Sequence, residues 1–166
     1  MIWVKLTEGQ LGVVAQVNSR PSWDEYFMHF AEESATRSKD TNTQVGACIV
    51  KDNRVLSLGY NGAPHAFPDD EVPTCRDTTM PLEMQKYPYM VHAELNAILN
   101  YHGSLRDFND ATIYVTHSPC FECAKALAQV GIKEVVYRKE YETNNCWDVS
   151  KIILNKCNIK YRKLEK

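Results

Sequence analysis

Two short strings constrain how this chain can fold more than any other feature of its sequence: His92-Ala93-Glu94 and Pro119-Cys120-Phe121-Glu122-Cys123. Each falls where the pattern of apolar residues predicts the start of a helix, over 91–101 and over 120–130. Gly103 and Gly131 then supply the helix ends. If the imidazole and the two thiols serve one purpose, the fold must bring both helix starts to one point.

The donor types in these strings are those that bind zinc. Cys120 and Cys123 are three residues apart and share one face of a helix, and a helix N-terminus favours their thiolate forms. With His92 they make three ligands and leave a fourth position for water, as catalytic zinc requires. Glu94 can reach the same water only within the first helical turn, because two residues are about 200° apart further along a helix.

Each part of this pattern, taken alone, also has an interpretation without a catalytic metal. A Cys-x-x-Cys pair alone is more typical of a structural zinc site or a redox pair. A structural zinc, however, takes four protein ligands, and the sequence offers no second pair. Glu94 alone could be a carboxylate that complements the helix dipole. The combination in this order favours a catalytic metal site.

Composition excludes several classes of protein. The 166 residues carry a net charge of −2 and the pI is about 6.2, whereas proteins that hold long nucleic acids carry a basic surplus. No apolar run approaches the roughly 20 residues of a membrane helix, and residues 1–10 do not resemble a secretory signal. We therefore expect no polynucleotide and no membrane partner, a cytoplasmic location, and reduced cysteines.

The order of predicted elements indicates an α/β fold in a single domain over 1–166. A hairpin gives an antiparallel pair, and strands that alternate with helices in the second half give parallel pairs. We expect a mixed five-stranded sheet with helices on both faces, in three α/β/α layers. Residues 1–20 form an N-terminal extension that could contact another subunit. The predicted helices are 22–39, 91–101, 120–130 and 145–155; the strands are 45–51, 54–60, 111–116, 134–138 and 159–162; a long loop covers 61–88.

The chain resembles a known family. The pattern H-x-E…P-C-x-x-C is the signature of zinc deaminases. Further strings resemble the deoxycytidylate (dCMP) deaminases of the cytidine/deoxycytidylate deaminase family, over about 27–141. These strings are Arg37-Ser38-Lys39-Asp40, Val45–Val50, Gly59-Tyr60-Asn61-Gly62, Lys86-Tyr87-Pro88-Tyr89 and His92–Ile98.

The resemblance implies a cytidine-deaminase-like fold and an activity. The family hydrolyses dCMP to dUMP and ammonia in pyrimidine deoxynucleotide synthesis. One Zn²⁺ held at His92, Cys120 and Cys123 activates water, and Glu94 moves the protons. Two thiolates and one neutral imidazole cancel the charge of Zn²⁺, so the metal lowers the pKa of water less strongly and a general base is needed.

The resemblance also implies substrate contacts. Asn61 would hold the sugar or the base, although Asn-Gly is equally typical of a turn. Ala93 and the backbone near Ser118 would contact the reacting base. The 5′-phosphate would be bound by Arg37, Ser38 and Lys39, with Arg138 and Tyr141 as further candidates; the alternative for the basic residues is a solvated charge at a helix end.

Regulation by dCTP and dTTP is implied as well, with Gly59, Tyr60, Asn61 and Gly62 as candidate effector contacts and Mg²⁺ accompanying the triphosphate. Relatives are homohexamers. The chain departs from the family at Thr41, where proline is usual, and at 63–68, where a Gly-Cys-Ser/Asp segment is common. Some relatives hold a second, structural zinc near this loop; His65 and Cys75 are candidate ligands, but two unrelated loop residues are the stronger interpretation.

Two rival functions remain open at this stage. The chain could deaminate another cytosine substrate, either free cytidine or deoxycytidine or a base in RNA or DNA. The modest acidity disfavours a polynucleotide, and the basic block at 37–39 favours a nucleotide. The chain could instead be an inactive module stabilised by zinc, but such a module has no need for Glu94.

Overall fold

A single five-stranded sheet organises the protein. The computed structural model describes residues 2–7, 10–14, 20–141 and 146–165. The strand order is β4-β3-β5-β6-β7. The first three strands in that order are antiparallel and the last three are parallel, which confirms the predicted mixed sheet. The strands are β3 (Gly46–Lys51), β4 (Arg54–Tyr60), β5 (Thr112–His117), β6 (Glu134–Lys139) and β7 (Lys160–Lys163).

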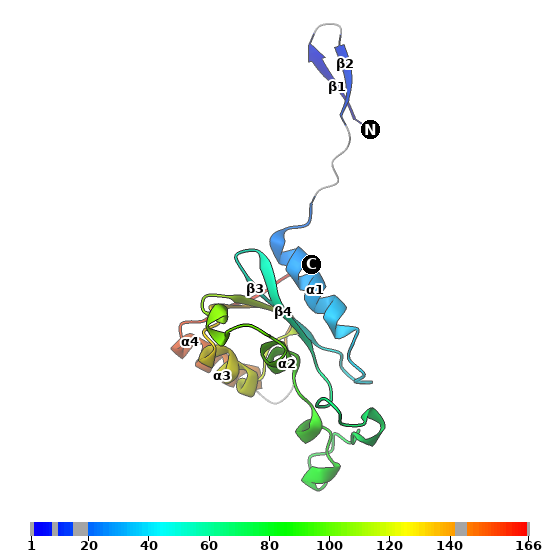
Figure 1. The fold of residues 1–166 in the computed structure, drawn as a ribbon, viewed down its shortest axis with the longest axis vertical. Coiled ribbons are helices and arrows are strands. Elements are labelled where there is room, and N and C mark those ends of the chain that lie inside the picture. Colours follow the sequence, from blue (N-terminus) through cyan, green and yellow to red (C-terminus); the bar gives the residue numbers. More distant parts are fainter. Residues whose placement is uncertain (1, 8–9, 15–19, 142–145, 166) are drawn as a thin grey trace.

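Helices cover both faces of the sheet, in the predicted three layers (Figure 1). Alternate residues of β3 point to opposite faces: Cys48 and Val50 pack with Phe27 beneath α1, and Ala47 and Ile49 belong to the larger core on the other side. The helices are α1 (Trp23–Ala35) on the first face and α2 (Ala93–Leu99), α3 (Phe121–Gln129) and α4 (Cys146–Lys156) on the second.

Local chemistry explains where several elements begin and end. The Oγ of Ser22 accepts a hydrogen bond of 3.1 Å from the N–H of Glu25, which caps α1 as predicted. The helix ends at Ala35, four residues earlier than expected, because 36–38 tighten into a turn with its N–H groups on 33–35. Asp52 and Asn53 join β3 to β4 with φ of 50° and 57°, values that Asp and Asn tolerate in hairpin turns.

The two helices of the predicted metal site start at Ala93 and Phe121, one or two residues later than expected. Val91 instead forms an isolated β-bridge with Gly62. Gly59 in β4 allows α2 to lie close, because a Cβ there would come within 2.3 Å of the Ala93 carbonyl oxygen. A glycine in the sheet thus positions the helix that carries Glu94.

Two segments lie outside the five-stranded sheet and its helices. No strand was predicted in the N-terminal extension, but β1 (Ile2–Thr7) and β2 (Gln10–Val14) form an antiparallel sheet of their own. The predicted loop 61–88 runs away from the sheet (Figure 1); its regular structure consists of short 3₁₀ turns and isolated β-bridges. The turns are η1 (Asp69–Glu71), η2 (Leu82–Met84) and η3 (Tyr87–Tyr89), with η4 (Leu105–Phe108) further on. Within the described residues, no helix has the length and apolarity needed to cross a membrane.

Candidate active site and metal centre

Three ligand atoms meet at the starts of α2 and α3. His92 is the N-cap residue of α2 and Cys120 is the N-cap residue of α3, while Cys123 lies in the first turn of α3. The Nδ1 of His92 lies 3.4 Å from the Sγ of Cys120 and 3.5 Å from the Sγ of Cys123. The two helix starts therefore converge, as the sequence required.

This arrangement fits zinc. Tetrahedral bonds to zinc place a nitrogen and a sulfur ligand about 3.6 Å apart, close to both observed separations. The ligand atoms of all three residues lie within 4.8 Å of one another. Among the described residues this is the one group of three or more such side chains that could hold a metal. His65 and Cys75, the candidates for a second zinc, do not belong to such a group.

The pKa values of the three ligand residues are shifted in different directions. Hydrogen bonds from Cys123 and, against the effect of burial, from His92 lower the pKa of Cys120 to about 4. The hydrogen bond to Cys120 raises the pKa of His92 to about 9, whereas the hydrogen bond to Cys120 and burial raise the pKa of Cys123. Zinc binding requires two thiolates and a neutral imidazole, so the metal must displace the protons that these three residues hold without it.

Glu94 lies in the first turn of α2 and is only 4% exposed. Burial raises the pKa of its carboxyl group, and the charge of His92 opposes the rise. A raised pKa suits a group that both takes and gives a proton near neutral pH. Its place two residues after His92, within the first turn, satisfies the geometric condition inferred from the sequence.

A cavity of about 330 Å³ opens beside these four residues, within the range of small-molecule sites. It combines apolar walls with polar groups from several segments of the chain. Its lining consists of Asp40, Thr43, Val45, Asn61, Arg76, Thr78, Lys86, Tyr87, Met90, His92, Ala93, Glu94, His117, Ser118, Cys120, Phe121, Glu122, Tyr141 and Cys146.

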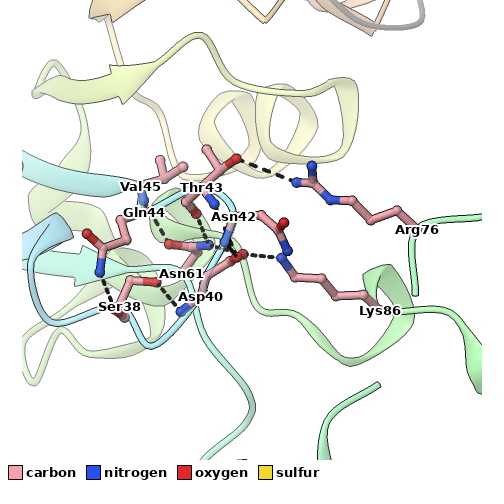
Figure 2. A network of polar contacts seen from close by, with 9 residues as sticks. All are labelled: Ser38, Asp40, Asn42, Thr43, Gln44, Val45, Asn61, Arg76 and Lys86. Carbon is pink, nitrogen blue, oxygen red and sulfur yellow. Dashed lines mark hydrogen bonds and ion pairs between the residues drawn. The ribbon is translucent and has the colours of Figure 1, made fainter. Parts of the chain in front are cut away.

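A buried ion pair lies in one wall of the cavity (Figure 2). The Nζ of Lys86 contacts the Oδ2 of Asp40, and the two side chains are 6% and 4% exposed. The Oδ1 of Asp40 accepts from the N–H groups of Asn42 and Thr43, at 2.8 and 3.2 Å. Together with an N–H of Asn61 on Oδ2, these bonds use all the acceptor positions of the carboxylate.

Asn61 is held firmly by the same network. Its Nδ2 donates to the Oδ2 of Asp40 at 3.1 Å and to the carbonyl of Thr43 at 2.9 Å. Its Oδ1 accepts from the N–H of Val45 at 2.8 Å. Both donors are therefore occupied, and one lone pair of Oδ1 is left for another partner.

The structure brings some predicted substrate contacts to the cavity and keeps others away. Asn61, Ala93, Ser118 and Tyr141 line it, and the Oγ of Ser118 accepts from the N–H of Tyr141 at 2.8 Å. Outside the lining are the predicted phosphate contacts Arg37, Ser38, Lys39 and Arg138 and the predicted effector contacts Gly59, Tyr60 and Gly62.

Arg138 has a different role from the predicted one. Its guanidinium is buried and pairs at 3.1 Å with both Glu25 and Glu32 of α1. It also donates to the carbonyls of Leu164 and Glu165. Arg138 therefore ties α1 and the C-terminal segment to β6, on the face of the sheet opposite to the zinc ligands.

Sequence reasoning missed three basic cavity residues, Arg76, Lys86 and His117. Lys86 did stand in a string that resembles the family, which could have marked it. His117, at the end of β5, packs edge-on against Tyr141 with ring centroids 6.2 Å apart. Arg76 had no such mark, because it lies in the long loop outside every recognised string.

A three-layer α/β/α fold in which two helix starts present one His, two Cys and a buried Glu defines the class of zinc-dependent deaminases. The family described as "Cytidine and deoxycytidylate deaminase zinc-binding region" matches residues 21–139. The chain belongs to this family of cytidine and deoxycytidylate deaminases.

Individual relatives agree with that assignment. The chain is 43% identical over 143 residues to the deoxycytidylate deaminase of Homo sapiens, which covers 85% of this chain and 79% of the human one. It is 41% identical over 128 residues to that of Mycobacterium phage D29, covering 74% and 98%. The crystal structure of dCMP deaminase from the cyanophage S-TIM5, in complex with dCMP and dUMP, superposes with a TM-score of 0.68 at 30% identity, covering 89% and 100%.

Proposed function

We propose that this protein catalyses the hydrolytic deamination of dCMP to dUMP and ammonia. One observation carries the proposal: the buried carboxylate of Glu94 lines the same cavity as the ligand residues His92 and Cys120. Relatives named deoxycytidylate deaminase, and a structural neighbour in complex with dCMP and dUMP, support the choice of substrate.

The reaction needs two proton transfers, which Glu94 can make in turn. Its carboxylate accepts a proton from the attacking water and gives it to N3 of the cytosine ring while the oxygen bonds to C4. It then takes the remaining hydroxyl proton and gives it to the amino group. The C4–N bond breaks, ammonia leaves and the carbonyl of uracil forms. Zinc held by His92, Cys120 and Cys123 would supply a Lewis acid that lowers the pKa of water, so that hydroxide can form and attack.

Cavity residues would hold the nucleotide. The free lone pair of Asn61 Oδ1 accepts a hydrogen bond from a sugar hydroxyl, and the N–H donors of Asn61 stay on Asp40 and Thr43. The backbone near Ser118 and Ala93 lies against the reacting edge of the base. Tyr141, fixed through the Oγ of Ser118, closes the sugar side.

The test is ammonia release from purified, zinc-loaded protein offered dCMP, deoxycytidine, cytidine or a cytosine-containing single-stranded oligonucleotide. We expect turnover of dCMP far above that of the other substrates, and loss of turnover with a chelator that is reversed by Zn²⁺. A preference for nucleoside or oligonucleotide would assign a different substrate. Zinc-loaded protein that releases no ammonia from any of them would indicate an inactive module.

The finer predictions from the family resemblance belong to the same proposal. They are regulation by dCTP and dTTP, with Mg²⁺ accompanying the triphosphate, a homohexamer to which residues 1–20 contribute, and a cytoplasmic location. Rates of dCMP turnover with each triphosphate, and the mass in solution with and without residues 1–20, test the first two. A rate that neither triphosphate changes would remove the regulatory part.

A further inference from the structure

A nucleotide substrate brings a charge that the cavity must receive. A phosphate monoester carries about −1.5 to −2 at neutral pH. The sequence suggested three basic residues as phosphate contacts, and none of them lines the cavity: Arg37, Lys39 and Arg138. The cations of the lining are Arg76 and Lys86, so the structure reduces the choice to these two.

Lys86 is already neutralised. Its ammonium contacts the carboxylate of Asp40, and the pair is buried. Drawing Lys86 toward a phosphate would leave Asp40 buried without its counter-charge, and an unpaired buried charge costs several kcal/mol. The pair as a whole contributes little net charge to the cavity, which leaves Arg76 to be considered.

Arg76 is held by neutral groups alone (Figure 2). Its Nη2 donates to the Oγ1 of Thr43 at 3.5 Å, a long hydrogen bond, and its guanidinium lies over the ring of Tyr87, 5.9 Å from the centroid. The adjacent Asp77 is engaged by the N–H and hydroxyl of Thr79 instead. No ion pair within the described part of the chain involves Arg76, which therefore keeps its full positive charge and most of its five donors.

The remaining charged groups of the lining do not cancel it. Glu122 is exposed and pairs with Lys125 at 2.8 Å, and Glu94 is buried beside the ligand residues. Four residues that carry hydroxyl groups, Thr43, Thr78, Tyr87 and Tyr141, line the cavity together with Arg76. A guanidinium among hydroxyl donors is well suited to a phosphate, which it can bind through two parallel hydrogen bonds.

We propose that Arg76, in the long loop 61–88, binds the 5′-phosphate and makes the site specific for nucleotides over nucleosides. The inference rests on the proposed deamination of dCMP. It assigns the preference for nucleotides over nucleosides to a residue of the loop, while the Asp40–Lys86 pair forms a wall of the cavity with little net charge.

The test compares kcat/KM for dCMP and deoxycytidine in wild type, Arg76→Ala and Arg76→Lys. Arg76→Ala should lower kcat/KM for dCMP about 10- to 100-fold, chiefly by raising KM, because one charge-assisted contact is lost. The value for deoxycytidine should stay within about twofold, since that contact does not exist there. Arg76→Lys should restore part of the preference through its charge. Arg54→Ala, which removes an exposed arginine at the start of β4 outside the cavity, should change neither.

An equal loss for both substrates, or no loss for either, would overturn the role of Arg76, as would a lysine variant no better than alanine. A binding experiment separates this failure from that of the proposed function. Calorimetry should show weaker binding of dUMP to Arg76→Ala than to wild type, with the affinity for deoxyuridine unchanged. Wild-type protein that turns over no substrate refutes the deamination, whereas Arg76→Ala that binds dUMP as tightly as wild type refutes the inference.

Discussion

Two clusters of ionisable groups lie at one cavity, and they differ in what their atoms are bonded to. In the metal cluster, His92, Cys120 and Cys123 direct their ligand atoms at one point, and Glu94 lines the cavity together with His92 and Cys120. In the Asp40 network, every acceptor position of the carboxylate is occupied by Lys86, Asn61 and backbone N–H groups.

The difference separates a reactive site from a structural one. Atoms aimed at a common point remain available to a metal, a water and a substrate, so the metal cluster can do chemistry. Atoms whose hydrogen bonds are complete within the protein hold segments together. The Asp40 network joins the turn after α1, the end of β4 and the loop before α2, and these three segments form one wall of the cavity.

The largest expected effect concerns Glu94. Replacing it with glutamine removes the proton carrier but keeps the size of the side chain, so kcat for dCMP should fall by about 10²- to 10⁴-fold while one zinc per chain is retained. Steady-state kinetics and metal analysis measure both. Glu122→Gln is the matched control, since Glu122 lines the cavity but is exposed and paired with Lys125. A Glu94→Gln enzyme that keeps substantial activity would exclude the proposed proton transfer.

Breaking the Asp40 network should instead affect stability. Lys86→Met leaves Asp40 buried without its counter-charge and should lower the free energy of unfolding by about 3–5 kcal/mol, measured by urea denaturation of the zinc-loaded protein. The double variant Asp40→Asn/Lys86→Met should recover part of the loss, because it leaves no charge behind. Lys125→Met breaks an exposed pair of similar type and should cost at most about 1 kcal/mol. Equal effects of Lys86→Met and Lys125→Met would contradict the comparison.

The smallest effect is a pH dependence of the same network. Burial opposes it, but the hydrogen bonds from Lys86 and from the backbone hold the pKa of Asp40 below its usual 3.8. A depressed pKa stabilises the fold above the unfolded value, and that contribution is lost as pH falls through the folded value. The stability gap between wild type and Asp40→Asn should therefore be constant at mildly acidic to neutral pH and narrow below about pH 4. A gap that persists unchanged to about pH 3 would contradict it.

The metal cluster could be predicted from sequence because its geometry is local. Cys120 and Cys123 are close along the chain, and His92 and Glu94 are closer still, so each pair is fixed by one helix start. The sheet was predictable for a similar reason, since hydrophobic periodicity and the turn at Asp52 and Asn53 act over a few residues. The boundaries that moved, at Ala35 and Ala93, lie where turns and bridges compete with the helix.

The rest of the site could not be predicted in this way. Arg138 lies near the end of β6, but Glu25 and Glu32, on a helix more than 100 positions away, pair with its guanidinium. Only packing decides which basic residue keeps a free guanidinium. For the same reason the sequence does not show that Arg76 has its charge available, whereas the charge of Lys86 is cancelled by Asp40.

By itself, the sequence indicated the candidate metal ligands, the proposed proton carrier and the mixed sheet, because these depend on residue type and on spacing within one element. The tertiary structure alone decided how the two helix starts meet and which polar groups surround the cavity. It also decided which charges are neutralised before a substrate arrives. The physical reason is that ion pairing and burial depend on distances between segments such as 40, 61, 76 and 86, which the order of residues does not specify.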